Sequence, residues 1–250
     1  MSQNFKLYSQ YYDLLYKHKD YKAETDYLLE LIQNYLPGAK NIIELGSGTG
    51  KHANLLAEKG FQILGLERSP EMVEIANQTK KDNVTFQVAD IAVFKTDQSF
   101  DVALSLFHVI SYLTDNQSLI NTFSHANSYL NKNGLLIFDV WHSPAVHAQV
   151  PEKRTKILKD EKIEVSRYAE PIIDSERNIV EVNYTIEVKN LNNEQTLTIN
   201  EKHPMRHFTK PEIELLAYAT GFEVLHNEEF LTGANPSGNT WGVCYVLRKK

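Results

Sequence analysis

Apolar and polar residues follow two different spacing patterns along this chain, and the first pattern covers residues 20 to 140. Short apolar runs predict strands, and the segments between them carry apolar residues at helical spacing. Tyr21 to Leu36 is one such segment, and further helices are predicted to start near Gly50, Pro70 and Asn116. The predicted strands are Asn41–Leu45, Gln62–Glu67, Val84–Val88, Val102–Leu106 and Leu135–Val140. Strands that alternate with helices along the chain predict a doubly wound α/β fold, which is a parallel sheet with helices on both faces.

The second spacing pattern begins after residue 150, where apolar residues recur at every second position. The predicted strands there are Ile163–Tyr168, Ile179–Lys189 and Thr196–His203. We therefore predict an antiparallel β meander, residues 151–206, inserted into a core made of residues 1–150 and 207–250. A helix at Lys210–Thr220 and strands at Phe222–Phe230 and Thr240–Arg248 complete this core. The core sheet is then mostly parallel and seven-stranded.

Three glycines join the first predicted strand to the helix after it, in the segment NIIELGSGTG. Gly46, Gly48 and Gly50 let the backbone lie against a ligand without a Cβ in the way. The spacing does not fit the dinucleotide fingerprint, whose third glycine would fall at position 51, where the chain has Lys51. A Walker phosphate loop is excluded as well. The pattern is E-x-G-x-G-x-G, and its alternative interpretation is an ordinary tight turn.

Acidic residues end the next two predicted strands. Glu67 lies 21 residues past Gly46, where a carboxylate accepts hydrogen bonds from the two hydroxyls of a ribose. Asp90-Ile91 follows the third strand and suits an adenine, with the carboxylate on the exocyclic amine and the apolar side chain on a ring face. Open α/β sheets bind ligands at the carboxyl ends of their strands. The pattern therefore predicts one nucleoside-containing ligand, against the alternative of a surface carboxylate and a helix cap.

Composition narrows the classes of partner. The 250 residues carry a net charge of −6 with no strongly basic stretch, which argues against nucleic acid. Cys244 is the single cysteine, so internal disulfides are excluded and a reducing, cytoplasmic location is expected. No apolar stretch is long enough to span a membrane. The histidines show no metal-ligand spacing, so no metal site is expected.

The order of these motifs resembles the class I S-adenosylmethionine (SAM) dependent methyltransferases over essentially the whole chain. More particular segments are similar to the N-methyltransferases of nucleotide-linked amino sugars, which put one or two methyl groups on the amine of a dTDP-linked deoxysugar. Those segments are YYDLLYKHKDYKAE, FDVALSLFHVISYL, DVWHSP, HFTKPEIE and GANPSGNTWG. The resemblance implies a Rossmann-like fold, SAM as the cofactor and a small-molecule acceptor, a nucleotide-linked sugar.

The resemblance also implies roles for single residues. The three glycines would cradle the methionine part of SAM, Glu67 would hold the ribose, and Asp90 and Ile91 would hold the adenine. Further cofactor contacts are expected from Tyr21, Glu44, Ser47, Arg68, Met72, Leu106 and Phe107. The N-terminal segment, with Tyr12, would form a lid over the cofactor. Substrate contacts are expected from Trp141, Arg167, Asn183 and Arg206.

Methyl transfer to an amine requires a free lone pair, so a residue that takes a proton is expected near the acceptor. The candidates are Tyr12, His108, Tyr112 and His142. Tyr112 stands where the related enzymes carry a histidine, and His108, four residues earlier, could face the same pocket. Packing is the alternative role for each of them. His52, beside the glycine loop, is interpreted as structural.

Three functions stay open from the sequence. The first is N-methylation of a nucleotide-linked amino sugar. The second is SAM-dependent methylation of another acceptor: a small acid, a phenol, a protein or RNA. The third is a SAM-binding module without catalysis. The strand edges of the meander also make a homodimer plausible.

Overall fold

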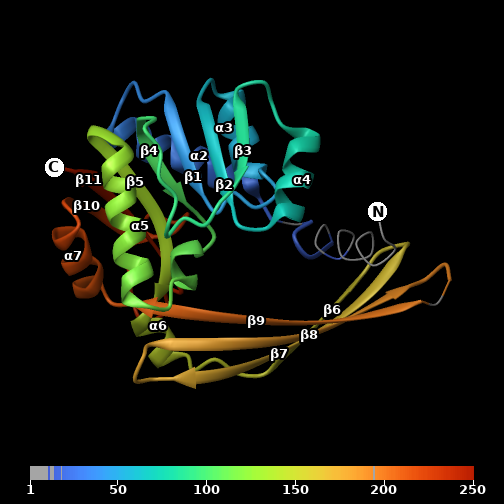
Figure 1. Ribbon diagram of the computed structural model, residues 1–250. Helices are drawn as coiled ribbons and strands as arrows, with labels where there is room; N and C mark the ends of the chain where they lie inside the picture. Colours follow the sequence, from blue (N-terminus) through green and yellow to red (C-terminus); the bar gives the residue numbers. More distant parts are fainter. Residues whose placement is uncertain (1–10, 12–13, 18, 194) are drawn as a thin grey trace. The chain divides into compact units, whose positions relative to one another are not determined.

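The computed structural model describes residues 11, 14–17, 19–193 and 195–250 (Figure 1). The chain divides into two compact units. One unit comprises Met1–Asp20 and Val150–Met205, and the other comprises Tyr21–Gln149 and Arg206–Lys250. Tyr12, one of the candidate catalytic residues, lies outside the described residues. Within the described part, no helix is long and apolar enough to cross a membrane.

The larger unit is built on a seven-stranded sheet. Its strands are β1 (Asn41–Leu45), β2 (Gln62–Glu67), β3 (Val84–Val88), β4 (Phe100–Ser105), β5 (Leu130–His142), β10 (Phe222–Glu229) and β11 (Gly242–Lys249). They lie in the order β3-β2-β1-β4-β5-β11-β10. β11 runs antiparallel to both its neighbours, whereas the strands β1 to β5 pair with one another in parallel. The predicted mostly parallel sheet of seven strands is confirmed.

Helices cover both faces of this sheet, as predicted. They are α2 (Tyr21–Tyr35), α3 (Lys51–Glu58), α4 (Pro70–Thr79), α5 (Asn116–Tyr129), α6 (Ser143–Ala148), α7 (Lys210–Ala219) and the short 3-10 helix η1 (Val109–Tyr112). Side chains of β5 alternate between two cores. Leu136 and Phe138 pack in the cluster that holds α5 and α7, whereas Ile137 packs in the cluster that holds α2, α3 and α4. The continuous apolar run of β5 thus arises from burial on both sides.

Local signals explain where the helices begin. Ser69 caps α4 by accepting a hydrogen bond from the Met72 N–H at 3.2 Å. Thr209 and Glu212 form a reciprocal capping box at the start of α7. α6 was not predicted, because six residues are too few to show a helical period.

The smaller unit contains the antiparallel meander. Its strands are β6 (Arg154–Lys159), β7 (Ile163–Asp174), β8 (Ile179–Asn190) and β9 (Thr196–Phe208), of which the last three residues belong to the larger unit. β7 pairs antiparallel with β6 and with β8, and β9 lies next to β8. The predicted meander is confirmed. β6 was missed because only Leu158 among its residues is even partly buried, so it has no apolar alternation.

Part of the N-terminal segment packs inside this smaller unit. Tyr11 and Leu14 are buried in one cluster with the meander residues Ile163, Val165, Ile186 and Val188. The sequence assigned this segment to the core as a lid over the cofactor. That role stays a prediction.

The turn after β1 depends on glycine for two separate reasons. Gly50 has φ 76°, and a Cβ at this position would lie 2.3 Å from Phe86 Cζ. Gly48 has φ 54°, but a Cβ there would meet no heavy atom within 4 Å. Both positions therefore carry the cost of a left-handed backbone, and only Gly50 adds a steric clash.

Gly50→Ala is expected to lower the free energy of unfolding by about 2–5 kcal/mol, from left-handed strain and overpacking together. Gly48→Ala is the matched control and is expected to cost about 1–2 kcal/mol. Urea unfolding of both variants and the wild type measures the difference. Equal losses at the two positions would contradict this account of the turn.

Candidate active site

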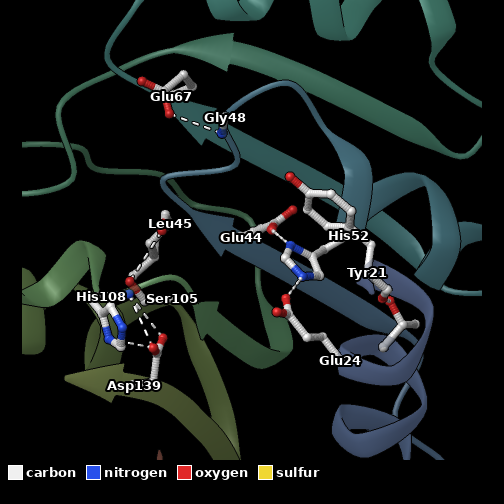
Figure 2. Close-up of polar contacts among 11 residues, drawn as sticks. Tyr21, Glu24, Glu44, Leu45, Gly48, His52, Glu67, Ser105, His108 and Asp139 are labelled. Atoms are coloured by element: carbon white, nitrogen blue, oxygen red, sulfur yellow. Dashed lines mark hydrogen bonds and ion pairs between the residues drawn. The ribbon is translucent and has the colours of Figure 1, made fainter. Parts of the chain in front are cut away.

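The glycine loop lies at the carboxyl edge of the sheet, fixed by backbone bonds to β2. The amides of Gly46 and Ser47 both donate to the carbonyl of Leu66, at 2.8 Å each. The Glu67 carboxylate then holds the loop, because its Oε2 accepts a hydrogen bond from the Gly48 N–H at 3.0 Å (Figure 2). Its Oε1 accepts from the Ser69 N–H at 2.9 Å. A carboxylate offers about four acceptor sites, so Glu67 can still accept from ligand hydroxyls.

Glu44 ends up buried directly below this loop. Its side chain is 2% exposed, and its Oε1 lies 3.8 Å from His52 Nδ1. Its Oε2 has no hydrogen-bond partner among the described residues. Burial, and after it the charge of Glu67, raises the pKa of Glu44 to about 8, although a hydrogen bond from the Ala53 backbone opposes this. Burial therefore favours the neutral acid, and a cationic donor beside the unpartnered Oε2 would favour the ionised form.

A histidine held by a buried carboxylate stands at the ends of β4 and β5. The His108 N–H lies 3.1 and 3.2 Å from the two carboxylate oxygens of Asp139. His108 Nδ1 lies 2.6 Å from Asp139 Oδ2 (Figure 2). The side chain of Asp139 is 1% exposed, and that of His108 is 26% exposed. This distance is that of an ion-pair contact, and Nδ1 makes no hydrogen bond among the described residues, so a buried carboxylate lies directly beside the ring.

The backbone at this histidine is itself unusual. Phe107 and His108 have φ values of 64° and 61°, a left-handed conformation that costs about 1–2 kcal/mol per residue. Strain of this kind clusters at functional sites, where the surrounding structure maintains it. Here the His108 backbone N–H, which donates to the Asp139 carboxylate, and the 2.6 Å contact of the ring with the same carboxylate help to maintain it.

The glycine loop and the histidine segment are in direct contact. A Cβ at Gly46 would lie 2.6 Å from Cγ2 of Val109, the residue after His108. Ser105, at the end of β4, donates from its hydroxyl to the carbonyl of Leu45 at 3.2 Å (Figure 2). Two predicted features that lie about sixty residues apart in sequence are thus fixed side by side.

Aromatic residues surround His108. Phe107 is 46% exposed and stacks on the His108 ring with centroids 6.2 Å apart. Trp141 meets His108 edge to face at 6.4 Å, and Trp241 meets Trp141 at 5.7 Å. Tyr112 is 39% exposed at the end of η1. Trp241 was not predicted as a site residue, although the GANPSGNTWG segment had been singled out.

His142 differs from His108 in its surroundings. It is buried, 7% exposed, at the end of β5. Burial lowers its pKa, and this is opposed by hydrogen bonds from the ring to the backbone of Thr240 and Ser237. This environment favours the neutral imidazole but places no carboxylate on it in the way that Asp139 is placed on His108. The catalytic roles of His142 and Tyr112 stay predictions.

The remaining predicted cofactor residues lie along the same edge of the sheet. Asp90 is exposed, and its Oδ1 accepts from the Ala92 N–H at 2.8 Å, which leaves Oδ2 for a ligand. Ile91 packs partly against the core. Ser47 and Leu106 are buried, Tyr21 and Met72 are half-buried, and Arg68 is exposed. Their cofactor contacts stay predictions.

Two of the predicted substrate residues, Arg167 and Asn183, lie in the smaller unit. Across β7 and β8, Asn183 lies opposite Glu170, and Arg167 lies opposite Ile186. Since neighbouring side chains on a strand alternate between the two faces, these pairs, three positions apart, put Asn183 and Arg167 on opposite faces of the meander. The Arg167 guanidinium stacks 3.8 Å over the Tyr184 ring. These two substrate contacts stay predictions.

Arg206 already has partners within the larger unit. Its Nη1 donates to Asn116 Oδ1 at 2.7 Å, and its Nη2 lies 3.5 Å from Glu212 Oε1. A phosphate at this guanidinium would have to compete with both. The predicted substrate contact of Arg206 therefore has less support than that of Trp141.

His52 is the centre of a second buried cluster. Its Nε2 lies 2.6 Å from Glu24 Oε2 on α2, and Tyr21 meets its ring edge to face at 5.1 Å. Figure 2 shows the imidazole between Glu24 and Glu44. Among the described residues, no group of three or more His, Cys, Asp or Glu side chains is arranged to hold a metal ion.

Comparison with known proteins agrees with this geometry. A provisionally named methyltransferase of Bacillus subtilis, YqeM, is 28% identical over 245 residues, which is 97% of this chain and 96% of that protein. The dTDP-3-amino-3,4,6-trideoxy-alpha-D-glucopyranose N,N-dimethyltransferase of Streptomyces venezuelae is 24% identical and covers 91% and 92% of the two chains. The crystal structure of Streptomyces venezuelae DesVI superposes with a TM-score of 0.82 over the full length of both chains, at 20% identity.

The family model described as a methyltransferase domain matches residues 16–227. That range contains the glycine loop, Glu67, Asp90 and the His108–Asp139 pair. The solved structures that share this fold include SAM-dependent methyltransferases. This chain therefore belongs to the methyltransferase-domain family and is a SAM-dependent methyltransferase with the class I fold.

Proposed function

We propose that this enzyme transfers the methyl group of SAM to the amine of a small molecule, an amino sugar carried on a nucleotide. The observation that carries the proposal is the His108–Asp139 pair, in contact with the cofactor loop through Val109. An amine is protonated near neutral pH, so it needs a base beside the methyl donor. An acceptor that is already nucleophilic would not need this arrangement.

The names of the relatives support the same class of acceptor. The Streptomyces venezuelae relative, and a Streptomyces fradiae relative 25% identical over 92% of this chain, are both named as N,N-dimethyltransferases of dTDP-linked amino sugars. The identities are low, so we extend the acceptor to this chain as part of the proposal only. The negative net charge of −6 also disfavours RNA.

The residues at the carboxyl edge would hold SAM along its length. Glu44 and the glycine loop would take the methionine end, Glu67 the ribose, and Asp90 with Ile91 the adenine. When bound, SAM supplies a methyl group on a positively charged sulfur. That leaving group is already activated, so the remaining task of the protein is to position the acceptor and to free its lone pair.

His108 would perform that second task. Its Nε2 takes a proton from the acceptor ammonium, which frees the nitrogen lone pair to form the new C–N bond as the C–S bond breaks. Asp139 stabilises the imidazolium that results, because the carboxylate is buried and already aimed at Nδ1. Trp141 and Phe107 would exclude water and provide apolar surface for a deoxysugar ring.

Incubation with SAM and a panel of dTDP-linked amino sugars is expected to give products heavier by one or two methyl groups. Mass spectrometry of the sugar nucleotide measures the gain. The controls are the matching sugars with a hydroxyl in place of the amine, and a phenol. Methylation of the phenol alone, or SAM binding without turnover of any acceptor, would contradict the proposal.

His108→Gln is expected to lower kcat by about 10²–10⁴-fold with little change in the Kd for SAM, because the base is lost and the cofactor loop is not. Asp139→Asn is expected to lower kcat by at least about tenfold, since the amide cannot stabilise an imidazolium. His226→Gln is the matched control, a histidine of β10 that lies 2.8 Å from the Glu228 carboxylate. A kcat for His108→Gln within threefold of the wild type would refute the assigned base.

A further inference from the structure

The Glu24–His52–Glu44 cluster encloses the cofactor loop from both ends. Glu44 lies in β1 two positions before the loop residues Gly46 to Gly50, and His52 follows them by two positions in α3. His52 Nδ1 lies 3.8 Å from Glu44 Oε1, an ion-pair distance, so the side chains on either side of the loop approach each other. The bond from Ala53 N–H to the Glu44 carboxyl acts in the same place, on the first turn of α3.

Glu24 fixes this joint to a third element. Its Oε2 lies 2.6 Å from His52 Nε2, and both side chains are less than a tenth exposed. Glu24 lies in the first turn of α2, beside Tyr21, whose ring contacts His52 edge to face. A carboxyl group thus lies within 4 Å of each nitrogen of the imidazole. The three side chains come from three different elements of the fold, α2, β1 and α3.

Glu44 has the longer of the two carboxyl contacts with His52. Glu24 from α2 and Glu44 from β1 lie on either side of one imidazole of α3, and the charge of Glu67 on β2 acts on Glu44. The short contact of His52 is with Glu24. Glu44 is left to take a proton or to meet an external cation, and its Oε2 has no hydrogen-bond partner among the described residues.

We propose that His52 is a positioning residue for the cofactor. Held in place by its contact with Glu24, His52 positions the Glu44 carboxyl at the base of the glycine loop. Cofactor binding then causes Glu44 to lose a proton. The inference rests on the proposed assignment of the methionine end of SAM to this loop. The cationic ammonium of that end favours the ionised carboxylate, and His52 keeps the newly charged group in place. Proton release and cofactor affinity are then linked through one cluster.

The sign of the pH dependence follows from the burial of Glu44. Its pKa is raised to about 8 without a cation beside it, so below this pH a proton must leave before the ammonium gains a charged partner. Affinity for SAM is therefore expected to increase as the pH rises toward about 8 and to level off above it. The same linkage makes binding at pH 7 release about one proton.

Isothermal titration of SAM into the full-length protein, in buffers of different ionisation enthalpy, tests the proposal without any acceptor. The wild type is expected to release about one proton at pH 7, and Glu44→Gln to release none. His52→Gln and Glu24→Gln are each expected to raise the Kd by about tenfold and to lower the number of protons released. Because no acceptor is used, failure to methylate an amino sugar would not affect the result.

His226→Gln is the matched control, since it removes a histidine–glutamate pair of 2.8 Å on β10 that does not touch the loop. It is expected to leave the Kd within twofold and proton release unchanged. Thermal melting of each variant checks folding, and Glu24→Gln provides a second variant should His52→Gln fail to fold. The proposal would be overturned if Glu24→Gln and folded His52→Gln both bound SAM with the affinity and the proton release of the wild type. It would also be overturned if the wild type bound SAM without releasing a proton.

Discussion

Burial of carboxylates at the carboxyl edge of the sheet is the constraint on which the site depends. Glu44 and Asp139 are almost entirely removed from water, and a buried charge without compensation is costly. Asp139 has a backbone N–H and an imidazole at 2.6 Å, whereas Glu44 has a backbone N–H and an imidazole only at 3.8 Å. Each carboxylate therefore determines where the next stretch of chain can lie.

This constraint connects the two halves of the chemistry. Glu44 fixes the loop proposed to hold the methyl donor, and Asp139 fixes the histidine proposed to accept a proton. Gly46 against Val109, and the Ser105 hydroxyl on the Leu45 carbonyl, hold the two parts together. A parallel sheet makes this possible because β1, β4 and β5 end at the same edge. The fold thus supplies the alignment, and the buried carboxylates supply the local geometry.

The sequence predicted the sheet, its helices and the meander because amphipathic period and burial on both faces leave strong patterns. It missed β6, whose side chains are mostly exposed, and α6, which is too short for a period. It also missed Asp139 as a site residue, because its partner His108 lies 31 residues away and the contact depends on strand pairing. One signal was present: a carboxylate inside the apolar run LLIFDV of β5.

Glu24 and Trp241 left weaker signals still, since an acid in a first helical turn and an aromatic in a loop are both common. The lid with Tyr12, the substrate contacts of Arg167 and Asn183, and a homodimer stay predictions. They depend on an acceptor or a partner chain, whose contacts no pattern within the chain encodes. The periodic spacing of apolar residues therefore predicted the fold. The contacts of the site depend instead on which strands pair, and that spacing does not encode them.

The most direct test of the central claim is the protonation state of the His108 ring, measured by 15N NMR with selectively labelled histidine and a His108→Gln sample for assignment. At the pH where methyl transfer is fastest, the account predicts a neutral ring with its proton on Nδ1, bonded to Asp139, and an unprotonated Nε2. Asp139→Asn should change this distribution. A proton found on Nε2, or a doubly protonated ring throughout the active pH range, would contradict the role of His108 as the base.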